Sequence, residues 1–203
     1  MILGINAVKN PIEYGVCADD FSQKQIWDGL GDVEQLPKRL KALVGDYSQL
    51  SGLFTILGPG NYTGIRLALT SIKMIGQLAN INVVGMSLFD AYLTMNSKNG
   101  VTLLTSPSRK GWLNAQLFQV TDESRSAISS LLQLELKSLN QWLDQFEHPI
   151  NWGHFGDIDG KFSISPKSAT FDILTAIDTN KDFILDASTT PATVPIYSYP
   201  AVS

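Results

Sequence analysis

A strand, a glycine-rich turn and a long helix in succession most constrain what this chain can fold into. The run Leu53 to Leu57 is short and rich in branched and aromatic residues, which is typical of a strand covered on both faces. Residues 58–64 contain three glycines and a Pro-Gly pair, and Asn61 or Thr63 can cap a following helix. Apolar residues three and four apart then predict a helix over Ile65 to about Ala79.

The predicted helix is apolar around most of its circumference. One apolar row contains Ile65, Leu69, Ile72 and Ile75, a second contains Leu67, Met74 and Leu78, and Arg66, Thr70, Lys73 and Gln77 form a polar stripe. A helix on one sheet normally has a single apolar stripe, so this helix needs a second cover besides its own sheet. That cover is either another part of this chain or a partner subunit, and the pattern leaves both open.

The glycine-rich turn also suggests phosphate binding. Free backbone N–H groups and the helix dipole favour an anion at the start of a helix. The spacing of Gly58, Gly60 and Gly64, however, matches neither the dinucleotide fingerprint nor a P-loop. We therefore favour a structural elbow over a phosphate cradle.

The nine residues from Gly58 to Arg66 resemble the TsaB (YeaZ-like) family. They read Gly-Pro-Gly-Asn-Tyr-Thr-Gly-Ile-Arg, where the family has Gly-Pro-Gly-Ser-Phe/Tyr-Thr-Gly-Leu/Ile-Arg. Lys73, the segment 83–88 and Pro195-Ile196-Tyr197 extend the resemblance. TsaB is the non-catalytic partner of TsaD in making threonylcarbamoyladenosine (t6A) on tRNA. The residues of the turn that the resemblance marks are Gly58, Pro59, Gly60, Asn61, Tyr62, Thr63, Gly64 and Arg66.

This resemblance implies an α/β protein with the actin-like ATPase (ribonuclease H-like) fold, in two related lobes of which the second is reduced and divergent. It implies a scaffold that activates a TsaD-like enzyme, with a TsaE-like ATPase as a further partner and tRNA contacted indirectly through the complex. ATP or ADP at the interface with TsaD is the one cofactor it implies, since the chain would have none of its own.

In TsaB proteins, the helix before the central strand and the helix after the glycine turn meet the matching pair of a partner. Val33 to Val44 is predicted to be the first of these helices, with Asp32 as its cap. We predict that the interface lies in or beside Leu36, Leu40, Leu43, Leu69, Ile72, Lys73 and Gly76.

The N-terminal order of elements supports the same fold. Strands at 1–6, 14–18 and 23–27, followed by helix, strand, helix and strand, form the opening of the actin and sugar-kinase type of fold. Nucleotide-binding members have an aspartate at the end of the first strand, where this chain has Asn6. An amide has no charge with which to hold Mg²⁺, so Asn6 is expected to satisfy backbone groups instead.

Two other functions remain open beside the scaffold. One is an ATP-dependent phosphotransferase or ATPase that uses the glycine turn as a phosphate cradle. The other is a homodimer with a separate role, because unpartnered apolar helices commonly self-associate.

Polar, turn-forming residues at 96–100 predict a boundary between lobes at 1–98 and 99–203. The second lobe is expected to contain strands at 101–105, 112–120, about 128–136 and 151–157, and helices at 138–146 and 167–177. Its opening turn has Pro107-Ser108-Arg109 where many TsaB proteins have Asp-Ala-Arg.

Composition limits the remaining functions. The 203 residues have a net charge of −4, which argues against a protein that binds nucleic acid over a broad surface of its own. No apolar run approaches ~18 residues, and the N-terminal residues lack the basic segment and cleavage site of a signal peptide, so we expect a cytoplasmic protein away from membranes. The single Cys17 excludes an internal disulfide. His148 and His154 have no third ligand at metal-binding spacing, and no Gly-x-Ser-x-Gly elbow is present, so we predict no metal site and no catalytic residue.

Overall fold

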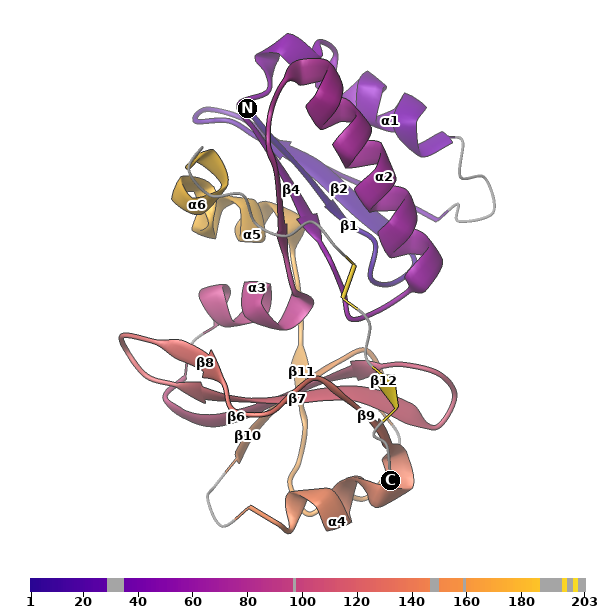
Figure 1. Cartoon of the computed structure of the whole chain (residues 1–203), viewed down its shortest axis with the longest axis vertical. Helices are drawn as coiled ribbons and strands as arrows, with labels where there is room; N and C mark the ends of the chain where they lie inside the picture. Colours follow the sequence, from indigo (N-terminus) through magenta and orange to yellow (C-terminus); the bar gives the residue numbers. More distant parts are fainter. Residues whose placement is uncertain are drawn as a thin grey trace. The chain divides into compact units, whose positions relative to one another are not determined.

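The structure, a computed structural model, describes residues 1–28, 35–96, 98–146, 150–158, 160–186, 195–196 and 199–200. The chain forms two compact units (Figure 1). The first contains Met1–Met95 and Phe171–Tyr197, and the second contains Asn96–Thr170 and Ser198–Ser203. The chain therefore returns to the first unit after residue 170. The predicted lobes, 1–98 and 99–203, do not include this return.

The first unit is built on a five-stranded sheet. Its strands are β1 (Ile2–Asn6), β2 (Ile12–Cys17), β3 (Ser22–Trp27), β4 (Gly52–Ile56) and β5 (Val83–Met86), in the order β3-β2-β1-β4-β5. Neighbours among β1, β2 and β3 are antiparallel, whereas β1, β4 and β5 are parallel. Three antiparallel strands followed by parallel ones form the predicted opening of the actin-like fold, which is confirmed.

Helices cover both faces of this sheet (Figure 1). On one face lie α1 (Gln35–Val44) and α2 (Tyr62–Ala79), which contact each other, and a short 3₁₀ helix η1 (Tyr47–Gln49) that contacts both. On the other face, α5 (Ile173–Thr179) contacts β1, β2 and β3, and α6 (Lys181–Leu185) contacts β4. The helix α3 (Leu88–Met95) packs on α5.

The second unit is built on a seven-stranded sheet. Its strands are β6 (Gly100–Pro107), β7 (Trp112–Val120), β8 (Arg125–Ala127), β9 (Leu132–Glu135), β10 (Ile150–Phe155), β11 (Lys167–Ala169) and β12 (Tyr199–Pro200). Their order is β11-β10-β6-β7-β9-β12, and β8 pairs with β7. A 3₁₀ helix η2 (Leu136–Ser138) leads into α4 (Leu139–Leu143), whose Leu139 and Leu143 are buried in the core of this unit.

The two sheets have the same topology, which confirms that the lobes are related. In β9-β7-β6-β10-β11 the first three strands are antiparallel and β6, β10 and β11 are parallel, as in β3-β2-β1-β4-β5. By this match α4 corresponds to α1. The described residues between β10 and β11 form no helix, whereas α2 lies between the equivalent strands β4 and β5. The second lobe is therefore reduced, as predicted, at the place where the first lobe has α2.

Two predicted elements of the second half were wrong. The predicted helix over 167–177 begins as the strand β11, and helix α5 starts only at Ile173. Asp172 is its N-cap, and its side chain accepts a hydrogen bond from the Thr175 backbone N–H at 3.0 Å. The predicted strand over 128–136 is shorter than expected, because only Leu132–Glu135 form a strand, β9, and residues 128–131 are irregular.

The predicted cap Asp32 and the first two residues of the predicted helix over 33–44 lie outside the described residues. Across the parts of the chain that the structure describes, no helix is both long enough and apolar enough to cross a membrane.

Candidate functional site

The glycine-rich turn joins β4 to α2 and packs against the C-terminal segment. Gly58 has a φ of +119°, a backbone conformation that glycine adopts readily. A Cβ there would lie 2.6 Å from the carbonyl oxygen of Ile196. The Ile196 N–H in turn donates to the Leu57 carbonyl at 2.8 Å, and the Leu88 N–H donates to the Gly58 carbonyl at 2.7 Å. The turn thus joins three segments that are distant in sequence.

The other two glycines of the turn touch the loop that follows β1. A Cβ on Gly60 would lie 2.3 Å from the Val8 carbonyl oxygen, and a Cβ on Gly64 would lie 2.5 Å from the Ala7 carbonyl oxygen. The Asn61 N–H donates to the Val8 carbonyl at 2.7 Å. All three glycines are therefore required by backbone contacts inside this unit, as expected for a structural elbow.

Polar groups near the turn are engaged within the unit as well. The Asn61 side chain caps α2 by accepting a hydrogen bond from the Gly64 N–H at 3.1 Å. Asn6 is 2% exposed, and its Oδ1 accepts from the Val8 N–H at 3.3 Å. Its amide nitrogen donates to Glu13 at 3.5 Å. Asn6 thus satisfies a backbone group at a strand end, as predicted.

The remaining side chains of the nine-residue run differ in exposure. Pro59 is buried, whereas Tyr62, Thr63 and Arg66 are exposed. Arg66 Nη1 donates to the Tyr62 hydroxyl at 2.7 Å, and its guanidinium lies 5.2 Å from the centre of the tyrosine ring. This pair lies on the first turns of α2.

The two apolar rows of α2 have different surroundings. Ile65, Leu69, Ile72 and Ile75 are at most 6% exposed and pack in the core of the first unit. In the second row Leu67 is half-buried, Met74 is 44% exposed and Leu78 is 69% exposed. We call Leu67, Met74 and Leu78 the outer row. The described parts of this chain cover one apolar flank of α2. Of the outer row, Leu67 packs partly against the same core, whereas Met74 and Leu78 are open to solvent.

The structure places most of the predicted interface residues in the core. Leu36, Leu40, Leu69 and Ile72 are buried, and so is Gly76, where a Cβ would lie 2.8 Å from the Ile81 carbonyl oxygen. Leu43 is half-buried and Lys73 is exposed. An interface in or beside these seven residues stays a prediction, but the five buried ones offer no side-chain surface to a partner. The outer row offers it instead.

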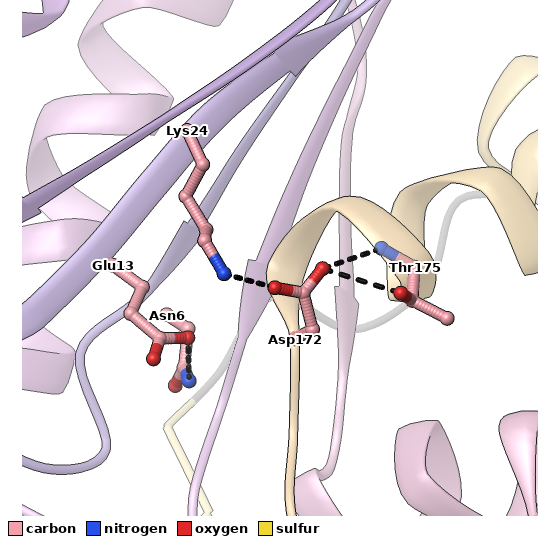
Figure 2. A network of polar contacts seen from close by, with 5 residues as sticks. All are labelled: Asn6, Glu13, Lys24, Asp172 and Thr175. Atoms are coloured by element: carbon pink, nitrogen blue, oxygen red, sulfur yellow. Dashed lines mark hydrogen bonds and ion pairs between the residues drawn. The ribbon is translucent and has the colours of Figure 1, made fainter.

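A polar network attaches α5 to the sheet of the first unit (Figure 2). Lys24 on β3 forms an ion pair with Asp172, whose other carboxylate oxygen accepts from the backbone N–H and hydroxyl of Thr175 at 3.0 and 3.2 Å. Burial raises the pKa of Asp172, but the hydrogen bonds from Lys24 and Thr175 outweigh it and hold that pKa below its usual range. The hydrogen bond to Asp172 raises the pKa of Lys24. The returning segment is thus fixed to the first unit by charge as well as by packing.

His154 of the second unit is 1% exposed and belongs to a buried hydrogen-bonded cluster. Trp152 Nε1 donates to the Thr105 hydroxyl at 2.8 Å, and that hydroxyl lies 2.7 Å from His154 Nδ1. Burial lowers the pKa of His154, which favours the neutral ring. Its Nε2 lies 3.4 Å from the Asp157 carbonyl, which can only accept, so in the neutral ring Nδ1 accepts the proton of the Thr105 hydroxyl. The other predicted histidine, His148, lies outside the described residues. In the described part of the chain, no three His, Cys, Asp or Glu side chains are grouped to hold a metal ion.

Comparison with known proteins shows the fold. No family profile and no curated protein matches the sequence. A solved Pseudomonas aeruginosa structure, described as an uncharacterized protein with similarity to peptidase YeaZ, superposes with a TM-score of 0.67 at 10% identity, over 98% of this chain and 99% of that one. YeaZ from Pseudomonas aeruginosa superposes with a TM-score of 0.65 at 11% identity, over 97% of this chain and 98% of that one. The resemblance carried by the glycine-rich run is therefore confirmed at the level of the fold.

Proposed function

We propose that this chain is a TsaB-type scaffold that docks on a TsaD-like threonylcarbamoyltransferase and activates it for t6A modification of tRNA. The observation that carries the proposal is the outer row of α2. Met74 and Leu78, beside the half-buried Leu67, form an exposed apolar flank on a helix whose other flank is packed in the core. Burying the outer row against helices of another subunit would remove apolar surface from water and stabilise the complex.

The proposed mode of action is conformational. Docking activates the enzyme only if its active and inactive states bind the helix pair α1 and α2 with different affinity. A TsaE-like ATPase and the tRNA would then bind the composite surface, and the tRNA would contact this chain through the complex. ATP or ADP would lie at the joint interface with the enzyme.

The glycine turn supports a non-catalytic role. At the start of α2, the Asn61 N–H donates to the Val8 carbonyl, and the Gly64 N–H donates to the Asn61 side chain. Both backbone N–H groups therefore already have a hydrogen-bond acceptor within the chain. A phosphate cradle needs such groups to face a ligand. Asn6 likewise donates to Glu13 and accepts from Val8.

Reconstitution of tRNA modification from purified components tests this function. The TsaD-like enzyme, the TsaE-like ATPase and this protein are combined with tRNA and ATP, and each component is omitted in turn. We expect t6A formation to fall at least tenfold when this chain is left out. Equal rates with and without it would contradict the scaffold role. Hydrolysis of ATP by this chain alone would favour the phosphotransferase or ATPase instead.

A further inference from the structure

The second unit contains a cavity of about 560 Å³ that the proposed scaffold role does not use. Four segments line it: the hairpin turn between β6 and β7 with Trp112, the end of β9 with the start of η2, Asn140 of α4, and the loop at residues 160–162. The parallel strands β6 and β10 end at Pro107 and Phe155, so this end of the sheet is the carboxyl end of its parallel strands. Open α/β sheets commonly bind ligands at that end.

The charge of the cavity is opposite to that of the chain. Three of the lining segments contribute one lysine each, Lys110, Lys137 and Lys161. Among the described residues of the lining, Glu135 is the one acidic side chain, and it pairs with Lys137 at 2.8 Å. Three positive charges against one negative leave an excess of two in a protein whose net charge is −4. Lysines that converge from separate segments favour an anionic ligand, and phosphate groups in particular.

Aromatic rings complete the lining. Trp112 and Phe162 both face the cavity, and the Arg109 guanidinium lies 4.3 Å from the centre of the Trp112 ring. Phe162 is held edge-on against Trp152, with ring centres 5.0 Å apart. An indole beside cationic groups is the usual means of stacking a nucleobase while holding its phosphate. The volume lies within the range of small-ligand sites and suits one nucleotide.

The walls of the cavity are fixed by hydrogen bonds. The Leu136 N–H donates to the Gly111 carbonyl at 2.9 Å, which joins η2 to the hairpin turn. The Asn140 amide donates to the Lys161 carbonyl at 3.1 Å and accepts from the Ser163 N–H at 3.0 Å, which joins α4 to the loop. A site held in shape before binding loses less entropy when a ligand arrives.

From these observations we propose that the cavity binds one phosphorylated nucleotide, with its phosphate on Lys110 and Lys161 and its base against Trp112. The nucleotide is either free or part of an RNA strand, because both present the same phosphate and ring. A site for a single nucleotide is compatible with an acidic protein, since it needs no broad basic surface. The inference stands on the second unit alone and does not depend on docking by α2.

Isothermal titration calorimetry on the full chain tests this proposal. The probes are AMP, ATP, inorganic phosphate and a short single-stranded RNA. The variant K110E/K161E reverses two of the three charges, and Trp112→Ala removes the ring. Lys98→Glu is the matched control, because Lys98 is exposed and precedes β6, at the other end of the sheet from the cavity.

We expect nucleotide binding by the wild type and by Lys98→Glu, and at least a tenfold loss in K110E/K161E and in Trp112→Ala. Circular dichroism of each variant checks that the fold is retained. AMP or ATP binding without RNA binding identifies a free nucleotide, and tighter RNA binding identifies a strand; either result supports the site. No binding by the wild type, unchanged binding by both cavity variants, or phosphate binding as tight as AMP would overturn the proposal.

Discussion

At the scale of single residues, the glycine-rich turn is specified by backbone contacts. Gly60 approaches Val8 and Gly64 approaches Ala7 more closely than a side chain allows. Asn61 then caps the helix that the turn begins. The resemblance to TsaB proteins therefore lies in residues whose first role is structural, and it predicts the fold more strongly than it predicts chemistry.

Gly60→Ala should destabilise the protein by about 3 kcal/mol, because the new Cβ would lie 2.3 Å from a backbone oxygen that cannot move independently. Gly45→Ala is the control, since Gly45 has a φ of +74° but a Cβ added there would meet no heavy atom within 4 Å. It should lose only about 1 kcal/mol from backbone strain. Urea unfolding followed by circular dichroism measures both, and equal losses would contradict the steric account.

Asp172→Asn should lower the free energy of unfolding at pH 7 by about 0.5 kcal/mol, because both partners of the ion pair are about one-third exposed. Asparagine can still cap α5, so the substitution isolates the charge. The folded-state pKa of Asp172 lies below the ordinary aspartate value of 3.8, so the carboxylate stabilises the fold fully above about pH 3.8. This stability is lost as the pH falls through the folded pKa.

The wild type and Asp172→Asn should therefore converge in stability as the pH falls below the folded-state pKa of Asp172. Urea unfolding across pH 2–7 measures the difference. Combining Asp172→Asn with Lys24→Gln at pH 7 completes a double-mutant cycle that isolates the Lys24 contact. A constant difference down to pH 2 would show that the charge of Asp172 has no part in stability.

At the scale of elements, the two apolar rows of α2 differ in their surroundings, although the sequence pattern shows them alike. Periodicity identifies two apolar rows but not which of them faces the sheet. Gly76 carries that information, because a Cβ there would lie 3.0 Å from Val83 Cγ2 on β5 and 3.3 Å from Leu53 Cδ1 on β4. The row beside it is the buried one, whereas Met74 and Leu78 of the outer row remain exposed.

Ile72→Glu should abolish folding, because it places a charge in the core with no partner, at a loss of more than about 4 kcal/mol. Leu78→Glu should change the free energy of unfolding by less than about 0.5 kcal/mol, since the side chain is 69% exposed and glutamate forms helices nearly as well as leucine. An acidic substitution at Leu69 or Ile72 therefore cannot serve as a clean test of assembly. Thermal unfolding distinguishes the two positions, and a similar loss at both would mean that the outer row is packed.

At the scale of the whole molecule, the first sheet was predictable and the path of the chain was not. Most strands and helices from β1 to α3 carry their own apolar run or periodicity, so local pattern located them, whereas β3 is exposed at all positions but Trp27. The edge strand β11 has three residues with one buried, Ala169, too few to show alternation. The return of α5 to the first unit depends on distant contacts such as Lys24 with Asp172, for which the sequence has no local signal.

The site was only partly predictable for the same reason. The glycine turn and the capping role of Asn61 follow from residue types and spacing. The interface prediction selected residues by family resemblance, and five of the seven prove to be core residues. The cavity of the second unit has no signal in the sequence, because Lys110, Lys137 and Lys161 lie far apart along the chain and line one cavity only in the folded unit.

The most direct test of the scaffold account measures the affinity of this protein for a TsaD-like subunit by calorimetry, with the mass of the complex checked by light scattering. Leu78→Glu is compared with Ile128→Glu, which makes the same kind of change at a 52% exposed site in the second unit. We predict that the wild type and Ile128→Glu bind equally and that Leu78→Glu loses at least tenfold in affinity while staying folded. Undiminished binding by Leu78→Glu would contradict the account.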